Sequence, residues 1–356
     1  MIRPIIGLDF DDVVAPFNSI ACKMANEDLG TTVSIKDITS WENTGKASVI
    51  KKYYHDRRLY ENQSNAITDE SKQAVRELME FADVYFISAV YPEFMSVRAA
   101  QIMEAFPEIP QNRIILGAAK DLVHFDFLLD DNINNVLSSP ADYPVLFRKP
   151  WNADMTGLLS VNSLNEFVCL VKNVIFPMIT GKSKITIPSV IALVGPTGSG
   201  KNEVAQKLCQ LTDLNYAFVR PAGYTTKPGS IGRTVLTEEE FDSKDFFEKT
   251  RYAGYGYGIE KAEIEAILRK GSFPVIPIDI CGAIGMKLHF PTIIVYLKRG
   301  KCDLVMNIIS DHSLSDKEKS LRILSLEAER KNETICDFSF RTEAAAIEIQ
   351  NLIKNA

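Results

Sequence analysis

Short runs of β-branched and aromatic residues alternate along this chain with longer segments in which apolar residues recur at helical spacing. In the first half the runs lie at 5–10, 84–87, 113–116, 125–129 and 145–147, and a charged helical pattern covers 69–81. A further run at 190–194 precedes a helical pattern at 203–211. This alternation predicts βαβ units with parallel sheets, and therefore an α/β protein.

The same pattern divides the chain into two parts. A length of 356 residues favours two domains, each able to bury its own core. We expect the first domain at 1–180, with a small helical insertion at about 18–65 and a closing helix at 163–176. The segment 177–188 has the composition of a linker, and we expect the second domain at 188–356.

Composition narrows the classes of function. The net charge of −6 argues against sequence-independent binding to duplex nucleic acid, and no apolar run is long enough to cross a membrane. Six scattered cysteines without a CxxC pair indicate buried thiols in a reducing compartment. The N-terminal residues predict a strand instead of a signal peptide, so we expect a cytoplasmic protein.

Two carboxylates follow the first apolar run directly. Asp9 and Asp11 are two residues apart at its end, so we expect their side chains to point the same way. Active sites of parallel sheets lie at this edge of the strands. Such a pair can divide the work of phosphate removal, because one carboxylate can attack phosphorus while the other protonates the leaving oxygen.

Three other strand ends offer matching chemistry. Ser88 can hydrogen-bond a phosphate oxygen, and Lys120 can neutralise phosphate and nucleophile together. Asp130 and Asp131 can hold Mg²⁺, which prefers oxygen ligands. Taken singly, each of these residues has a plainer explanation as a turn, a loop or a surface charge. Their occurrence together at strand ends favours an active site.

These residues resemble the four motifs of the haloacid dehalogenase (HAD) superfamily of phosphatases. Residues 9–17 and the insertion around Trp41 are similar to those of the 5′(3′)-deoxyribonucleotidases within it. The resemblance implies a Rossmann-like parallel sheet with a small helical cap. It also implies Asp9 as nucleophile and Asp11 as general acid and base, with Phe17 and Trp41 around the nucleoside. The implied metal ligands are Asp9, Asp11, Asp130 and Asp131, and Ser88 and Lys120 complete the catalytic set.

Three positions depart from this family pattern. Asp12 stands where a glycine is usual, Ala89 replaces a hydroxyl residue after the second motif, and Ala118 replaces a basic residue before the third. These departures concern substrate positioning more than chemistry. For the two aromatic residues a second interpretation stays open. A place in the cap core is the plainer interpretation of Trp41, whereas Phe17 suits the core and the nucleoside site equally.

The second half carries a glycine-rich loop between an apolar run and a helical pattern. Its residues are Gly195, Pro196, Thr197, Gly198, Ser199, Gly200 and Lys201. Such a loop turns backbone N–H groups toward phosphate oxygens, and its lysine reaches the β- and γ-phosphates of ATP. The pattern continues with Ser or Thr to hold Mg²⁺, and this chain has Asn202. A glycine-rich turn without nucleotide is the plainer alternative.

Downstream, the chain resembles guanylate kinase and other P-loop nucleoside monophosphate kinases. The similar motifs are 225–228, 238–248, 257–258 and 279–282. The resemblance implies that Lys227 and Tyr257 hold the acceptor phosphate, that Glu248 contacts the base, and that Asp279 contacts the metal or the acceptor. It further implies a helix at 327–337 and a strand at Phe338.

The acceptor site departs from that family. Tyr224, Arg233 and Ile259 stand where a small hydroxyl residue, a tyrosine and a Thr or Ser are usual. We therefore expect no intact guanine site, and a modified pyrimidine fits better. Arg322 and Arg330 can supply charges to a lid, although a solvated helix face is the plainer interpretation of both.

Three functional hypotheses remain. The first is a bifunctional enzyme using Mg²⁺ and ATP, which hydrolyses one deoxynucleoside monophosphate through an aspartyl-phosphate and phosphorylates another. The second is nucleic-acid end repair of the polynucleotide kinase/phosphatase kind. The third is an active deoxynucleotidase carrying a non-catalytic nucleotide-binding module. For the bifunctional enzyme we expect small-molecule nucleotides as partners and no binding to duplex nucleic acid or membrane. A homodimer is a further possibility.

Overall fold

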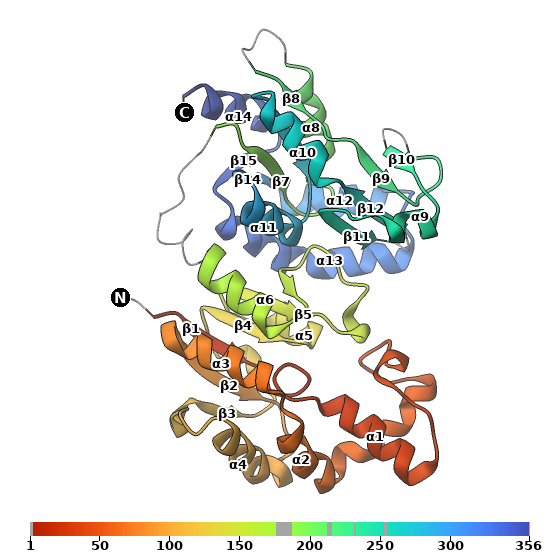
Figure 1. Cartoon of the computed structure of the whole chain (residues 1–356), viewed down its shortest axis with the longest axis vertical. Coiled ribbons are helices and arrows are strands. Elements are labelled where there is room, and N and C mark those ends of the chain that lie inside the picture. The colour runs from red at the N-terminus through yellow and green to blue at the C-terminus, as the bar shows by residue number, and fades with distance from the viewer. Residues whose placement is uncertain (1–2, 176–186, 212–215, 231–232, 253–254, 356) are drawn as a thin grey trace. The chain divides into compact units, whose positions relative to one another are not determined.

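Two parallel sheets, one in each unit of the chain, are built from the apolar runs of the sequence (Figure 1). The computed structural model describes residues 3–175, 187–211, 216–230, 233–252 and 255–355. The N-terminal unit comprises Met1–Met155 and Leu159–Val171, and the C-terminal unit comprises Thr156–Leu158 and Lys172–Ala356. Most of the expected linker at 177–188 lies outside the described residues.

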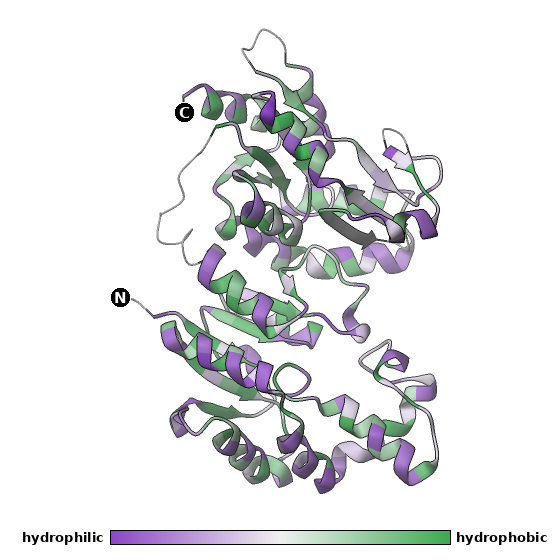
Figure 2. Ribbon diagram, in the orientation of Figure 1, coloured by the Kyte–Doolittle hydropathy of each residue, from purple (hydrophilic) through white to green (hydrophobic). Residues whose placement is uncertain are grey.

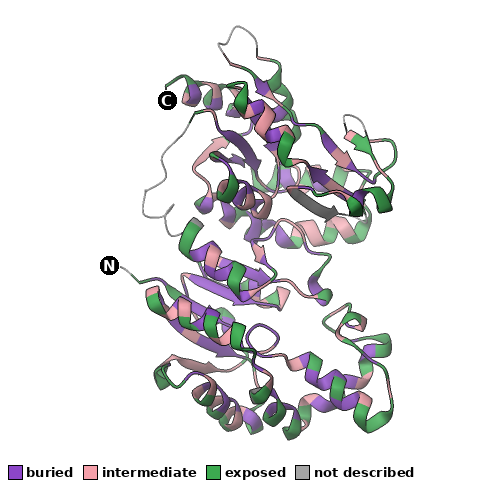
Figure 3. Ribbon diagram, in the orientation of Figure 1, coloured by how far each residue is buried: buried purple, intermediate pink, exposed green. Residues whose placement is uncertain are grey.

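The N-terminal unit contains a six-stranded parallel sheet in the order β3-β2-β1-β4-β5-β6. Its strands are β1 (Ile5–Leu8), β2 (Asp83–Ser88), β3 (Ile114–Leu116), β4 (Phe127–Asp130), β5 (Tyr143–Phe147) and β6 (Ser160–Val161). Each expected run forms one of the first five strands. The sequence did not predict β6, because its two residues are too few to show a hydrophobic pattern. The central strands are apolar and buried, as parallel strands covered on both faces must be (Figures 2 and 3).

Helices lie between these strands along the chain, and the last one follows β6. They are α3 (Asp69–Phe81), α4 (Met95–Ala105), α5 (Ile133–Ser138) and α6 (Leu164–Cys169), the last continued by a π-helical segment, Leu170–Ile175. The helix α3 has the expected bounds because Thr68 caps its N-terminus by accepting from the Ser71 amide at 3.1 Å. The expected helix at 163–176 is present in two parts, since its last turns change from α to π geometry.

A helical insertion separates β1 from α3, as the sequence predicted. It contains α1 (Phe17–Leu29), α2 (Arg57–Gln63) and the 3₁₀ segments Ile35–Asp37, Gly45–His55 and Ser64–Ala66. A separate apolar cluster holds it together, with Met24, Ile50 and Tyr60 among its buried members. We call this insertion the cap.

The C-terminal unit contains a five-stranded parallel sheet in the order β15-β14-β7-β13-β8 and a four-stranded sheet in the order β10-β9-β12-β11. The strands of the first are β7 (Val190–Val194), β8 (Phe218–Val219), β13 (Phe273–Pro277), β14 (Thr292–Lys298) and β15 (Phe338–Arg341). Those of the second are β9 (Gly223–Thr225), β10 (Arg233–Val235), β11 (Glu248–Tyr252) and β12 (Tyr255–Ile259).

Two helix boundaries in this unit differ from the prediction. The helices are α8 (Lys201–Cys209), α9 (Glu238–Ser243), α10 (Lys261–Arg269), α11 (Ile280–His289), α12 (Lys301–Ser310), α13 (Asp316–Lys331) and α14 (Ala345–Lys354). The first begins earlier than 203, because Gly200 turns the chain into it with a left-handed φ of 87°. The helix expected at 327–337 is present only in its first part, because α13 runs from Asp316 to Lys331 and a 3₁₀ turn follows.

The structure bears on two expectations from composition, one about membrane-spanning helices and one about the cysteines. In the described part of the chain, none of the helices combines the length and the apolarity needed to cross a membrane. None of the six cysteines, all of which the structure describes, forms a disulfide. Of the buried thiols that we expected, only Cys22 is buried, whereas three are half-buried and Cys209 and Cys302 are exposed. Their helices, α8 and α12, turn these positions outward.

Gly7 offers a test of how tightly the first sheet is packed. A Cβ at this position in β1 would lie 2.7 Å from the ring of Phe125. We expect Gly7→Ala to lower the free energy of unfolding by about 1–3 kcal/mol, because the ring has to move within a filled core. Both tryptophans of the chain, Trp41 and Trp151, belong to the N-terminal unit, so their fluorescence follows its unfolding.

The control for this prediction is Gly285→Ala in α11. No described atom lies within 4 Å of the added Cβ, leaving aside the helix's own backbone and the adjacent residues. Gly285 belongs to the C-terminal unit, so its effect is followed by the circular dichroism of the whole chain, where we expect no loss of stability. An unchanged fluorescence transition for Gly7→Ala would show that the close approach of Phe125 has no energetic consequence.

Candidate functional sites

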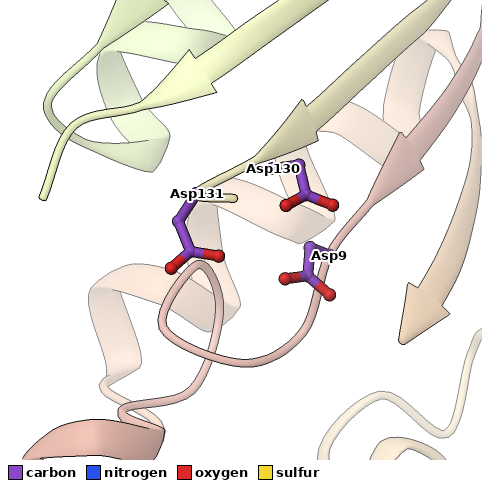
Figure 4. A group of neighbouring side chains, drawn as sticks. All are labelled: Asp9, Asp130 and Asp131. Carbon is purple, nitrogen blue, oxygen red and sulfur yellow. The ribbon is translucent and has the colours of Figure 1, made fainter. Parts of the chain in front are cut away.

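Three buried carboxylates meet at the carboxyl edge of the first sheet. Asp9 follows β1, and Asp130 and Asp131 lie at the end of the neighbouring strand β4 (Figure 4). One oxygen of each lies within 4.8 Å of the others. Because hydrogen-bonded neighbours in a parallel sheet end at the same edge, the topology brings together residues that are far apart in sequence.

Lys120 bridges two of these carboxylates. Its Nζ lies 2.7 Å from Asp9 Oδ1 and 2.7 Å from Asp130 Oδ2. Burial alone would lower the pKa of the Lys120 ammonium, but the charges of Asp9 and Asp130 raise it above its usual range. Lys120 is therefore a charged group in the interior and not the surface lysine of the plainer explanation.

One lysine does not balance this cluster. Burial raises the pKa of Asp9, and it raises the pKa of Asp130 to about 6 despite Lys120. The pKa of Asp131 lies well above its ordinary value because of burial and the neighbouring carboxylates. A buried excess of negative charge formed by oxygen ligands fits a divalent cation such as Mg²⁺.

Asp11 has a different environment from the other predicted metal ligands. Its carboxylate accepts from Arg98 Nη2 at 2.7 and 2.9 Å and from Gln63 Nε2 at 2.7 Å. Among the described residues, Asp11 does not belong to the group of carboxylates that can share an ion. Its side chain, expected on the metal, is thus held by Arg98, whose guanidinium is fully buried over the ring of Phe10.

Ser88 lies where the sequence placed it, at the end of β2. It is fully buried, and its hydroxyl has no hydrogen-bond partner in the described part of the chain. An unsatisfied buried hydroxyl is costly unless a ligand atom completes it. This is the environment expected of a residue that binds a phosphate oxygen.

A cavity of about 390 Å³ opens beside these groups. Asp9, Asp11 and Lys120 line it, and the cap and adjoining loops add aromatic walls from Phe17, Trp41, Tyr54, Tyr60, Tyr91 and Trp151. Trp41 is 46% exposed, so it belongs to the cavity mouth and not to the cap core. Phe17 lines the cavity and also packs against Tyr54 at 5.4 Å between ring centroids, so its position fits both interpretations.

Several residues of this site carried no sequence signal. Trp151 Nε1 donates to Asp131 at 3.0 Å, and Asn135 Nδ2 donates to both oxygens of Asp130. Arg98 and Gln63 were likewise missed. Each reaches the site from an element with no motif of its own.

Asp12, the residue in place of the usual glycine, has a left-handed φ of 57°. Its carboxylate accepts from the amides of Phe17 and Asn18, each at 3.1 Å, and so satisfies the first two amides of α1, whose N-cap residue is Pro16. Burial raises the pKa of Asp12 to about 7. The departure from the family pattern thus fixes the start of the cap.

The second site is the loop between β7 and α8. Gly198 and Gly200 have φ of 80° and 87°, which lets the chain wrap before the helix begins. Lys201 Nζ donates to the carbonyls of Gly195 at 2.5 Å and Pro196 at 3.0 Å, and burial lowers the pKa of this lysine. The Ser199 hydroxyl is buried and has no partner among the described residues.

Two arginines add to the positive charge at this loop. Arg322 Nη1 donates to Thr197 Oγ1 at 2.7 Å, and Arg299 Nη1 donates to the Gly198 carbonyl at 3.2 Å. The solvated helix face expected for Arg322 is therefore wrong. Arg330 fits that interpretation, because it is exposed and pairs with Glu327 at 3.6 Å.

The predicted acceptor residues are only partly brought together. Tyr257 and Asp279 line one cavity with Lys201 and Asn202. Asp279 also caps α11 by accepting from the Gly282 amide at 2.8 Å. Lys227 is exposed and lies outside that lining. Glu248 begins β11, but its side chain lies outside what the structure describes.

Asn202 is engaged with a neighbouring arginine. Its Oδ1 accepts from Arg220 Nη2 at 2.8 Å. In a P-loop this position supplies a hydroxyl to Mg²⁺. The amide oxygen of Asn202 instead accepts a hydrogen bond from an arginine of the protein.

Known proteins resemble each half of the chain. The family model described as "5′ nucleotidase, deoxy (Pyrimidine), cytosolic type C protein" matches residues 3–175. A 5′(3′)-deoxyribonucleotidase of Bacillus subtilis strain 168 is 25% identical over 168 residues, covering 46% of this chain and 96% of the relative. The N-terminal half is thus similar to deoxyribonucleotidases, as its motifs predicted.

Guanylate kinases are similar to the C-terminal half. The enzyme of Chlamydia felis is 23% identical over 181 residues, covering 48% of this chain and 82% of the relative. A crystal structure of guanylate kinase from Anaplasma phagocytophilum covers 48% of this chain and 86% of its own, at 16% identity and a TM-score of 0.35. The sequence likeness agrees with the motifs found downstream of the loop.

The buried pair of Arg98 and Asp11 predicts a stability effect. We expect Arg98→Met to lower the free energy of unfolding of the N-terminal unit by about 3 kcal/mol, because it leaves Asp11 without its charged partner. Tryptophan fluorescence in a urea titration measures this change.

The matched control is Arg76→Met. Arg76 also pairs with a carboxylate at 2.7 Å, that of Glu108, but both side chains are exposed. A loss of less than about 1 kcal/mol is expected there. Equal losses in the two variants would contradict a special role for the buried pair.

Proposed function

We propose that the N-terminal unit hydrolyses a deoxynucleoside monophosphate and that the C-terminal unit transfers a phosphoryl group from ATP to a nucleoside monophosphate. The observation that carries the first half is the buried bridge from Asp9 through Lys120 to Asp130, at the floor of a cavity with aromatic walls. The likeness to 5′(3′)-deoxyribonucleotidases supplies the substrate class.

Hydrolysis in the N-terminal unit would proceed through the Asp9 carboxylate. One of its oxygens attacks phosphorus, the bond from phosphorus to the nucleoside oxygen breaks, and Asp11 gives that oxygen a proton. Water then attacks the aspartyl-phosphate, Asp11 takes the proton of the water, and phosphate leaves with Asp9 restored. The products are one nucleoside and one phosphate ion.

The surrounding side chains prepare these steps. Lys120 offsets the charge of the nucleophile and of the incoming phosphate, and the unpartnered Ser88 hydroxyl can bond a phosphate oxygen. Arg98 and Gln63 hold Asp11 in one orientation on the cavity wall. Mg²⁺ would be held by Asp9, Asp130 and Asp131, and when bound it would neutralise charge on the phosphate.

Phosphoryl transfer in the C-terminal unit rests on the charge around its loop. Lys201, Arg299 and Arg322 surround a loop whose residues bend in the manner of a phosphate cradle. Transfer would occur in line, from the γ-phosphate of ATP to a phosphate oxygen of the acceptor, by positioning and charge neutralisation. Tyr224, Arg233 and Ile259 favour an acceptor base other than guanine.

A second candidate for the C-terminal unit is a nucleotide-binding module without turnover. The contact of Asn202 with Arg220 favours it, because it removes the usual hydroxyl ligand for Mg²⁺ and occupies the amide oxygen. Nucleic-acid end repair has less support, since the net charge of −6 opposes a backbone-binding surface. We propose small nucleotides as the partners.

The decisive experiment is chromatography of the protein with ATP, Mg²⁺ and each common deoxynucleoside monophosphate in turn. Nucleoside from some monophosphates and diphosphate from others supports both activities. Nucleoside alone, with ATP bound but not consumed, supports the binding module. Release of phosphate only from a DNA end favours end repair.

The nucleophile gives the first activity prediction. We expect Asp9→Asn to lower nucleoside formation by more than about a thousandfold, because an amide does not attack phosphorus. Asp121→Asn is the control, since Asp121 is exposed, is next to Lys120 in sequence and does not line the cavity. Retained activity in Asp9→Asn would refute the covalent mechanism.

Lys201 of the glycine-rich loop gives the second activity prediction. Lys201→Met is expected to lower diphosphate formation by more than about a hundredfold, since it removes a charge from the phosphate cradle. Lys207→Met, an exposed position on the same helix α8, is the control. If both variants form diphosphate at equal rates, the transfer does not occur at this loop.

A further inference from the structure

A chain of hydrogen bonds with a single direction runs along the wall of the N-terminal cavity. Asn43 Nδ2 donates to the Tyr54 hydroxyl at 2.7 Å, and that hydroxyl donates to Asn18 Oδ1 at 2.6 Å. Asn18 Nδ2 then donates to Asp12 Oδ2 at 2.7 Å. The Asp12 carboxylate therefore lies at one end of this hydrogen-bond chain, and the Asn43 amide lies at the other.

The carboxylate sets the direction of every bond in this chain. The ionised carboxylate of Asp12 can only accept, and it accepts from the backbone amides of Phe17 and Asn18 and from the side chain of Asn18. The amide nitrogen of Asn18 therefore faces Asp12, and its amide oxygen faces Tyr54. Tyr54 has one hydroxyl hydrogen, which it gives to Asn18, and its oxygen can then only accept from Asn43. The Asn43 amide is thereby fixed with its nitrogen toward Tyr54 and its oxygen at the free end.

That free oxygen is buried and unsatisfied. Asn43 is 6% exposed and lines the cavity, and its Oδ1 has no hydrogen-bond partner among the described residues. The hydroxyl of Ser40, which also lines the cavity, is buried without a partner in the same part of the structure. A turn joins the two residues, since the Asn43 amide donates to the Ser40 carbonyl at 3.2 Å.

The backbone at Asn43 shows that this placement is specific. Its φ of 46° is left-handed, a conformation that asparagine tolerates better than most residues. The turn thus directs an amide into the cavity at a small conformational cost. A buried acceptor left without a donor is itself costly, so the pair of unsatisfied groups indicates a polar ligand edge.

We propose that this unit selects its substrate by an N–H group on the nucleobase, which donates to Asn43 Oδ1 while the Ser40 hydroxyl bonds the adjacent polar atom. The inference rests on the proposed nucleotidase function and adds the recognising residues. Tyr54, Asn18 and Asp12 are positioning residues, because they fix which end of the Asn43 amide faces the base. Asp12, which also binds the first amides of α1, acquires a role in specificity.

The test compares each hydrolysed nucleotide with an analogue that lacks the base N–H. The pairs are thymidine monophosphate with its N3-methyl derivative, and the cytosine and adenine deoxynucleotides with their dimethylamino derivatives. We expect wild-type kcat/KM to be at least about tenfold higher for the unmodified member, as the loss of one hydrogen bond to a buried acceptor requires. The ratio of the two values is the readout.

Three variants locate the discrimination. Asn43→Gly keeps the left-handed backbone and removes the acceptor, so its ratio should fall close to one. Tyr54→Phe keeps the ring packing on Phe17 but frees the amide of Asn43, so its ratio should also fall. Glu42→Gln, an exposed neighbour on the same turn outside the cavity lining, should keep the wild-type ratio.

The ratio of the two kcat/KM values distinguishes a loss of base recognition from a general loss of stability or catalysis. Both substrates are measured on one protein preparation, so a loss of stability or of catalysis cancels between them. A wild-type ratio near one, or an unchanged ratio in Asn43→Gly, overturns the inference while the nucleotidase function stands. If none of the common deoxynucleoside monophosphates is hydrolysed, the function and the inference fall together.

Discussion

The ion bridge of Lys120 is the interaction on which the first site depends. Three carboxylates buried at one sheet edge would repel one another and lose their hydration, a combination that few folds tolerate. Lys120 offsets part of this penalty by contacting Asp9 and Asp130 at once. It leaves an excess of negative charge, so the same arrangement that stabilises the site also favours a divalent cation.

The order of the strands makes this bridge geometrically available. β1 lies between β2 and β4, so Ser88 and Asp130 end on either side of Asp9. The cap follows β1 directly and returns its aromatic side chains above the same edge. Chemistry therefore comes from the rigid sheet, and recognition comes from the inserted helices, which have an apolar core of their own.

Sequence reasoning found the groups whose position follows from local pattern. Asp9, Ser88 and Asp130 each end an apolar run, and the strands that carry them were predicted from that run. Arg98 is different, because it reaches Asp11 across 87 residues of sequence from a helix without a motif. The contact of Arg322 with Thr197 spans 125 residues and depends on how α13 packs, which local periodicity does not encode.

Two residues that depart from the family patterns, Asp12 and Asn202, have opposite effects on their sites. Asp12 accepts a left-handed backbone, which costs about 1–2 kcal/mol outside glycine, and offsets it with bonds to the start of α1. The departure therefore leaves the carboxylate cluster intact and orients Asn18 toward the cavity. Asn202 keeps an oxygen where a hydroxyl is usual, but Arg220 takes it. Asp12 finds its partners at the start of α1, away from the reacting groups, and the chemistry of its site is preserved. Asn202 uses the oxygen that would face Mg²⁺ to bind Arg220, and this changes the chemistry of its site.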